Sequence, residues 1–188
     1  MLKRLLIAMF FLVSLDALVS PARADDGQDA LTALRRLVGL IRYERNEQAL
    51  GLIATDRMVS FLLGSNSATP EQKSRLASLL GEYIELKAFP MALEYFKDID
   101  LTYDAPTTVG EQVHIRSSVL YGGSEQVTMT WVMARVGADY KLVDFLDQQG
   151  QSQMTVNRDR VITPLINQRG VDGLITQMQT TINGLRQQ

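Results

Sequence analysis

The sequence predicts an α+β fold in which helices pack on one face of a curved, four-stranded antiparallel sheet. Three observations favour it. Apolar residues recur at helical spacing over 29–63 and 69–96, they alternate with period two over 99–146, and helical spacing returns over 161–185. The composition, with 46% hydrophobic and 21% charged residues among 188, is that of an ordinary globular chain.

Residues 1–24 have the pattern of a cleaved signal peptide. Lys3 and Arg4 precede nine apolar residues, Leu5 to Val13, and the sequence Ala22-Arg23-Ala24 provides a cleavage site of the A-x-A type. A membrane-spanning helix needs roughly 20 apolar residues, so this run is too short to be one. We expect cleavage after Ala24 and a single domain over 25–188. The alternative is an uncleaved amphipathic anchor.

Charge and cysteine content exclude several classes of function. Residues 1–24 hold three of the 19 basic and one of the 21 acidic residues, so the mature part has a net charge near −4. Without a basic run, that charge argues against nucleic acid and anionic membrane surfaces as partners. The absence of cysteine excludes lipidation of a cysteine, disulfides and thiolate metal sites. We therefore expect an exported, soluble protein, which in a Gram-negative cell is periplasmic.

Helices are expected first along the chain. An apolar stripe over 29–63 is interrupted by the polar residues 44–48, and Asp56 is a candidate cap for the last of these helices. Thr69-Pro70-Glu71-Gln72 has the sequence of a capping box with proline at the first helical position. Pro90 is expected to kink or end the helix that follows.

Four strands are expected over 99–105, 111–121, 125–136 and 139–146. A three-residue turn at Gly122-Gly123-Ser124 would place Val119 opposite Val127, Ile115 opposite Trp131 and Val113 opposite Met133. We prefer this register because it gathers apolar residues on one face. In the last hairpin, either Val143 and Phe145 or Leu142 and Leu146 face inward. Two helical stripes follow, separated at Gly170.

Residues with catalytic chemistry are few. His114 is the only histidine and faces away from the apolar side of its strand, so no metal site or hydrolytic triad is expected. Asp144 lies within an apolar run, where burial would make it a general base. The other interpretation is that Asp144 faces outward or caps a neighbouring helix. Residues 122–124 lack the lysine and helix of a phosphate loop and indicate a hairpin turn.

The remaining signal is an excess of large apolar side chains on both layers. Methionines on one strand suit a wall that adapts to varied ligands, so we expect an NTF2-like cone with an apolar cavity between sheet and helices. Periodicity does not separate such a cavity from a filled core. The expected lining is Leu80, Ile84, Leu93, Val113, Ile115, Val119, Met129, Trp131, Met133, Val143, Phe145, Leu165, Ile166, Leu174 and Ile175.

Several stretches, in order, resemble the MlaC or toluene-tolerance family over some 130 residues from Asp56 onward. They are Met58 to Gly64, Thr69 to Gln72, Ala92 to Tyr95, Val119 to Glu125, Tyr140 to Phe145 followed by Gly150, Ser152 and Arg158, and Gly170 to Ile175.

The resemblance implies a periplasmic carrier, not an enzyme, that binds a phospholipid as cargo, needs no cofactor and acts as a monomer. It would shuttle the lipid between the outer and inner membranes. Its partners would be an inner-membrane ABC-type lipid transporter complex and an outer-membrane lipoprotein complex. A hopanoid or another lipid is an alternative cargo. Two other functions remain: a ligand-free periplasmic interaction module, and a small-molecule isomerase or dehydratase using Asp144.

Overall fold

The structure, a computed structural model, describes residues 24–96, 101–121 and 125–187. The first half is helical: α1 (Ala24–Arg42), α2 (Asn46–Leu50), α3 (Thr55–Leu63), α4 (Pro70–Tyr83), the π-helix η1 (Ile84–Ala88) and α5 (Phe89–Phe96). The strands are β1 (Thr102–Tyr103), β2 (Thr107–Val109), β3 (Gln112–Tyr121), β4 (Glu125–Val136) and β5 (Asp139–Leu146). The chain ends in α6 (Gln153–Asn157), the π-helix η2 (Arg158–Ile162) and α7 (Thr163–Leu185). The expected signal peptide, apart from Ala24, and the turn residues 122–124 lie outside the described residues.

The α+β prediction is confirmed, with five strands rather than four. They form one antiparallel sheet in the order β1-β3-β4-β5, and β2 also pairs with β3. Thr102 pairs with Ser118 and Thr107 pairs with His114. The edge segment that carries β1 and β2 therefore has one residue more between these two pairs than β3 has. Pro106 lies in this interval and has no amide to donate to the sheet. β1 therefore lies within the predicted first strand, 99–105, whereas β2 lies beyond the proline, where no strand was predicted.

The preferred register of the central hairpin is confirmed. Val113 pairs with Met133, Ile115 with Trp131 and Val119 with Val127. The last hairpin combines the two predicted alternatives, because a bulge follows Val132. Leu142 lies opposite Met133 while Phe145 lies opposite Trp131, so Val143 is the additional residue.

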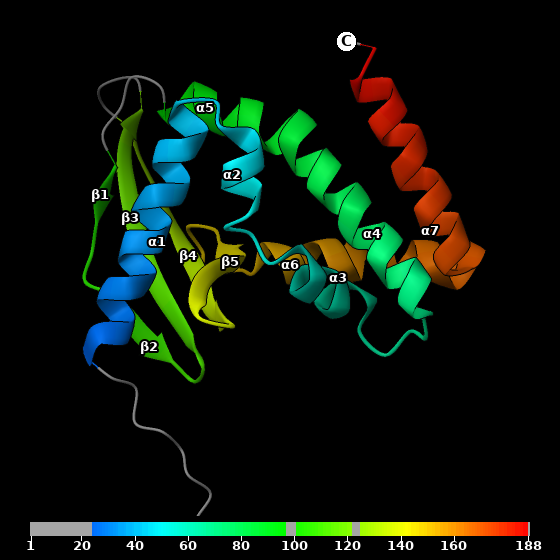
Figure 1. Cartoon of the computed structure of the whole chain (residues 1–188), viewed down its shortest axis with the longest axis horizontal. Coiled ribbons are helices and arrows are strands. Elements are labelled where there is room, and N and C mark those ends of the chain that lie inside the picture. The colour runs from blue at the N-terminus through cyan, green and yellow to red at the C-terminus, as the bar shows by residue number, and fades with distance from the viewer. Residues whose placement is uncertain (1–23, 97–100, 122–124, 188) are drawn as a thin grey trace, which may run out of the picture.

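Helix α1 lies across one face of the sheet, as Figure 1 shows. Leu34 and Leu37 of α1 have no exposed surface and pack with strand residues such as Ile115. We call this core the sheet cluster. Its buried members are Ala30, Leu31, Leu34, Leu37, Val38, Ile41, Ala49, Ile53, Met58, Ile84, Phe89, Val113, Ile115, Trp131, Met133, Tyr140 and Leu142.

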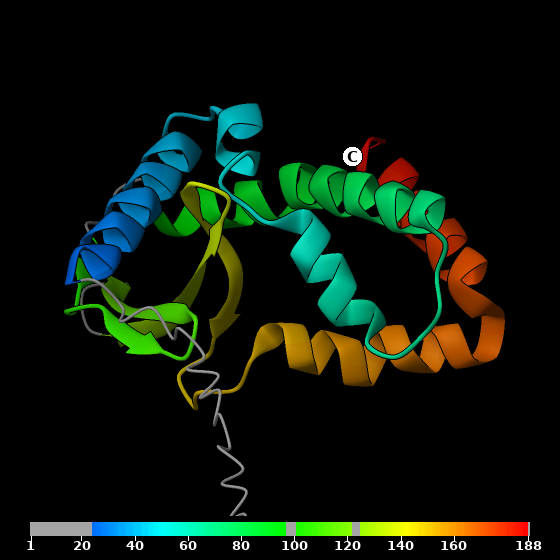
Figure 2. The same cartoon turned by 60° about the horizontal axis from the view of Figure 1, so that its bottom comes forward.

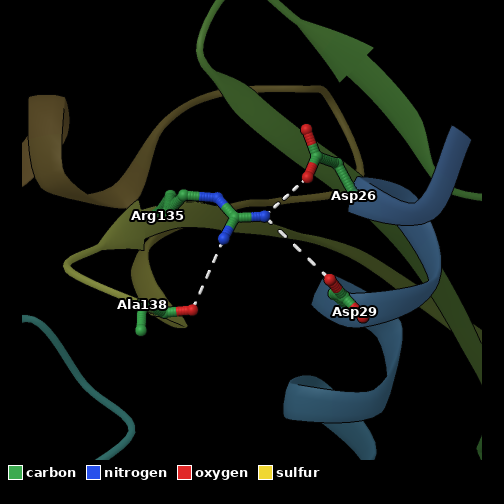
Figure 3. A network of polar contacts seen from close by, with 4 residues as sticks. All are labelled: Asp26, Asp29, Arg135 and Ala138. Atoms are coloured by element: carbon green, nitrogen blue, oxygen red, sulfur yellow. Dashed lines mark hydrogen bonds and ion pairs between the residues drawn. The ribbon is translucent and has the colours of Figure 1, made fainter. Parts of the chain in front are cut away.

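The start of α1 is tied to the hairpin between β4 and β5. The Arg135 guanidinium donates to Asp26 at 2.6 Å, lies 4.0 Å from a carboxylate oxygen of Asp29 and donates to the Ala138 carbonyl at 3.4 Å (Figure 3). The guanidinium also lies over the Tyr140 ring, 4.8 Å from its centroid. The hydrogen bond to Asp26 raises the pKa of Arg135 above its ordinary value. Arg135 thus positions α1 along the sheet.

A second core lies among α3, α4 and α7, which extend away from the sheet beyond β5 (Figures 1 and 2). We call it the helix cluster. Its buried members are Val59, Leu63, Leu76, Ala77, Ile166, Val171 and Leu174. Leu80 of α4 packs against both clusters. The chain therefore has two apolar cores that meet at Leu80.

Local signals at the helix starts are partly confirmed. The Thr69 hydroxyl accepts from the Gln72 amide at 3.2 Å and the Gln72 side chain accepts from the Thr69 amide at 3.0 Å, which is the predicted capping box. Asp56 is not the cap of its helix. α3 begins at Thr55, the residue before Asp56, and Ala54 occupies the cap position. The Asp56 carboxylate therefore lies in the first turn. There it still interacts favourably with the helix dipole.

Of the two outcomes expected at Pro90, a kink or an end of the helix, the end does not occur. The π-helix η1 ends at Ala88, α5 begins at Phe89, and the helical path continues through Pro90. In a π-helix the backbone hydrogen bonds join residues five positions apart, which widens the turn. The wider turn lets the helix continue although proline has no amide hydrogen to donate. The same arrangement precedes Pro164, where η2 ends at Ile162. Val161 lies inside η2 and is exposed, because the wider turn shifts it out of the predicted apolar stripe.

The predicted break at Gly170 is confirmed. Gly170 has φ +68° and ψ −179°, a conformation essentially restricted to glycine. α7 changes direction there, where orange passes into red in Figure 1. This turn brings both halves of α7 into the helix cluster, through Ile166 before it and Leu174 after it.

Candidate functional site

The apolar residues expected to line a cavity lie in two separate cores. In the sheet cluster, Ile84, Val113, Ile115, Trp131 and Met133 are buried, and Met129 packs against them. In the helix cluster, Ile166 and Leu174 are buried, with Leu165 and Ile175 packed against them, while Leu80 contacts both. Val119, Leu93, Val143 and Phe145 belong to neither cluster. The structure therefore does not bring the expected residues together as one surface.

Where α1 meets the sheet, the described side chains are closely packed. Ile115 and Met133 have no exposed surface. The Trp131 indole nitrogen donates to the Ser117 hydroxyl at 2.8 Å, and both residues are buried. Among the described residues, no buried side-chain nitrogen or oxygen lacks a hydrogen-bond partner. This interface has the properties of an ordinary core.

A pocket of about 360 Å³ lies where the sheet meets α3 and α6. We call it the junction pocket. Its apolar lining comes from five elements: Phe61 on α3, Val109 on β2, Ala134 on β4, Val143 on β5 and Met154 on α6. Met154 packs against the sheet cluster, whereas Val59 and Leu63 of the same helix as Phe61 belong to the helix cluster. The pocket thus lies beside α3, the helix that contributes Met58 to the sheet cluster and Val59 and Leu63 to the helix cluster.

Four polar residues complete the lining of the junction pocket: Arg57, Glu111, Gln112 and Asp144. Arg57 and Glu111 are exposed and form no ion pair within the part of the chain that the structure describes. His114 follows Gln112 by two residues on β3 and is half-buried. Its ring shares a 3.4 Å hydrogen bond with the Gln112 side chain. The pocket therefore combines apolar walls with charged groups at its rim.

A further arginine lies beside this pocket. The Arg158 guanidinium lies 4.8 Å from the centroid of the Phe61 ring and donates to Asp159 at 2.8 Å. The hydrogen bond from Arg158 lowers the pKa of Asp159 below its ordinary value. Phe61 is 41% exposed despite this contact, so its ring remains available on the pocket side.

Comparison with known proteins places the chain in a family. The sequence model of the MlaC protein matches residues 41–180. The chain belongs to the MlaC family. A solved structure described as a phospholipid-binding protein from Ralstonia solanacearum, in complex with a phospholipid, has the same fold. Its TM-score is 0.70 at 16% identity, and the match covers 85% of this chain and 98% of that one. None of the curated proteins compared with the chain matches it in sequence.

In this MlaC chain, Asp144 connects β5 to the start of α6. One carboxylate oxygen accepts from the backbone amides of Phe145 at 2.7 Å and Met154 at 3.0 Å, and the other accepts from the Ser152 hydroxyl. Ser152 in turn caps α6 by accepting from the Thr155 amide at 2.9 Å. The outward, helix-capping interpretation of Asp144 therefore fits these contacts.

Replacing Asp144 by asparagine tests this role. An amide nitrogen cannot accept the Ser152 hydroxyl, so we expect the free energy of unfolding to fall by about 1–2 kcal/mol, with the total amount of bound lipid near normal. Urea unfolding provides the measurement. Asp139→Asn is the matched control, because Asp139 is exposed on the same strand and should change little. A folded Asp144→Asn protein that lost turnover of a small substrate would instead favour the enzyme.

Other features of the described residues were compared with the junction pocket: a second hollow, possible metal ligands and possible membrane spans. A second, open hollow of about 530 Å³ lies against α7 and η2 and includes Leu165, Arg160 and Arg169. Among the described residues, no three His, Asp or Glu side chains come together to hold a metal ion. Nor does any described helix have the length and apolar character needed to cross a membrane.

Only Val143 of the expected lining reaches the junction pocket. The apolar residues Phe61, Val109, Ala134 and Met154, which also line this pocket, are not among those expected from the sequence. Phe61 lies outside the Met58, Val59, Leu62 and Leu63 stripe of its helix, and that off-stripe position is the signal that could have identified it. The other three residues are small or isolated in sequence, so periodicity does not mark them.

Proposed function

We propose that this MlaC-family protein is a periplasmic lipid carrier that takes up a phospholipid and shuttles it between the outer and inner membranes. Membership of the family, whose members are in general periplasmic, supports the compartment. The phospholipid held by the Ralstonia protein of the same fold supports the cargo. The observation in this chain that carries the proposal is the junction pocket, in which five of the nine lining residues are apolar and which lies beside α3, a helix that contributes to both apolar cores.

The acyl chains would enter the junction pocket and separate the sheet cluster from the helix cluster. Burial of one methylene contributes about 0.8 kcal/mol, so a chain of a dozen methylenes gains on the order of 10 kcal/mol before ordering costs. Half-buried apolar residues already lie along the boundary, with Leu80 contacting both clusters and Met154 at the pocket wall. A lipid inserted there would replace contacts between side chains with contacts to its chains.

Such affinity makes spontaneous release slow, because the dissociation rate falls as the buried apolar area grows. Delivery then requires a partner that opens the pocket. The proposed partners are an inner-membrane ABC-type lipid transporter complex and an outer-membrane lipoprotein complex, with the carrier itself a monomer cleaved after Ala24. The carrier needs no catalytic group or cofactor.

Mass spectrometry of the exported protein tests the proposal. Under native conditions we expect the mass of the chain beginning at Asp25 plus one phospholipid, and organic extraction should release that lipid stoichiometrically. A well-folded exported protein without any bound lipid would overturn the proposal and favour a ligand-free interaction module. A species that retained residues 1–24 in the membrane fraction would overturn the cleavage.

A further inference from the structure

The rim of the junction pocket holds two free charges of opposite sign. Arg57 lies on α3, Glu111 lies in the turn between β2 and β3, and both residues line the pocket. Both side chains are exposed, and neither has a charged partner in the described ranges 24–96, 101–121 and 125–187. A ligand in the pocket would therefore meet one guanidinium and one carboxylate that are not committed elsewhere.

The other charged groups near the opening are occupied or lie off the lining. The Asp144 carboxylate already accepts from two backbone amides and the Ser152 hydroxyl. Arg158 lies over the Phe61 ring and pairs with Asp159. Lys141 lies opposite Ala134 in the sheet but does not line the pocket. Among lining residues, the charges are thus one cation and two carboxylates, of which one carboxylate is free.

From this arrangement we infer that the junction pocket selects lipids whose headgroup carries both a phosphate and an ammonium group. This inference rests on the proposed function as a lipid carrier. The Arg57 guanidinium matches the geometry of a phosphate and can donate to two of its oxygens. The Glu111 carboxylate accepts from the ammonium group. A headgroup with a phosphate alone keeps the first contact, but leaves Glu111 without a cation and adds net negative charge near Glu111 and Asp144.

The two rim residues therefore have separable effects. The phosphate is common to all phospholipids, so Arg57 contributes to how much lipid is bound. The ammonium group distinguishes one headgroup class, so Glu111 contributes to which lipid is bound. Ion pairs at exposed positions are weak, and we expect the selectivity to be about two- to fivefold.

A vesicle exchange experiment tests the selectivity. Delipidated protein is incubated with vesicles containing equal amounts of phosphatidylethanolamine and phosphatidylglycerol with identical acyl chains, then separated, extracted and quantified by mass spectrometry. We expect the unchanged protein to be enriched about two- to fivefold in phosphatidylethanolamine. Glu111→Gln should return the ratio to that of the vesicles, and Glu111→Lys should reverse it. Arg57→Gln should lower total lipid with less effect on the ratio.

Glu47→Gln on α2 is the matched control, because Glu47 is exposed and does not line the pocket, so the ratio should stay that of the unchanged protein. The inference about selectivity would be overturned if the lipid ratio in the unchanged protein equalled that of the vesicles, or if Glu111→Gln left the ratio unaffected. In either case, stoichiometric lipid would still support the proposed function as a carrier. Failure of the unchanged protein to load either lipid would overturn both proposals.

Discussion

Filling the junction pocket by Val143→Trp is expected to remove most of the co-purifying lipid, about a tenfold loss of occupancy, while the protein stays folded. Val143 is the additional residue of the β5 bulge, is half-buried and lines the pocket. An indole there occupies space that the acyl chains would need, and each displaced methylene forfeits about 0.8 kcal/mol of burial. The free energy of unfolding should change by less than about 1 kcal/mol, because the side chain enters an open space rather than a filled core.

The same substitution in the second hollow is the control. Val161→Trp adds an indole at an exposed position on η2, and the amount of extracted lipid should remain that of the unchanged protein. If Val161→Trp lowered lipid occupancy and Val143→Trp did not, the lipid would bind against α7 and not in the junction pocket.

Placing a tryptophan at Ile115 should have the opposite outcome, with a large loss of stability. Ile115 has no exposed surface and lies directly opposite Trp131. A second indole on this face must displace the packed residues of α1, and overpacking of this kind costs about 1–3 kcal/mol. Urea unfolding, followed by the far-ultraviolet circular dichroism, measures the change.

Arg116→Trp is the matched control for Ile115→Trp, because Arg116 is the next residue of β3 and is exposed. It should change the free energy of unfolding by less than about 0.5 kcal/mol. An Ile115→Trp protein that kept its stability but lost its lipid would show that lipid also enters between α1 and the sheet. The expected lining residues Trp131 and Met133 would then contact the ligand.

The register of the central hairpin was predictable from sequence, because alternation on β3 and β4 allows only one pairing that gathers Val113, Ile115, Trp131 and Met133 on a face. The register of the last hairpin was not predictable, because a bulge inserts Val143 into β5. Leu142 from one predicted alternative and Phe145 from the other therefore both pair with residues of the same face of β4. The break at Gly170 was predictable because glycine commonly follows the end of a helix. The conformation that Gly170 adopts does require glycine. Pro90 was expected to kink or end its helix, and the π-helix before it lets the helical path continue, so only the end does not occur.

The candidate site was less predictable than the fold. Apolar periodicity reports which side chains are buried but not which core they join, so Ile115 and Ile166 were expected on one surface and lie in two clusters. The junction pocket is lined by residues such as Phe61 and Ala134 that are distant in sequence. Only the tertiary arrangement brings them together.

The ion pair between Arg135 and Asp26 joins residues 109 positions apart, and it has a consequence for how the protein folds. α1 is synthesised before the strands, but its apolar face packs against β3, β4 and β5, which follow α2 to α5 in the chain. The sheet cluster therefore cannot close until most of the chain is present, and such long-range contacts make folding slow. Until then the apolar face of α1 is open to aggregation, so folding yield should depend on chaperones that cover this helix.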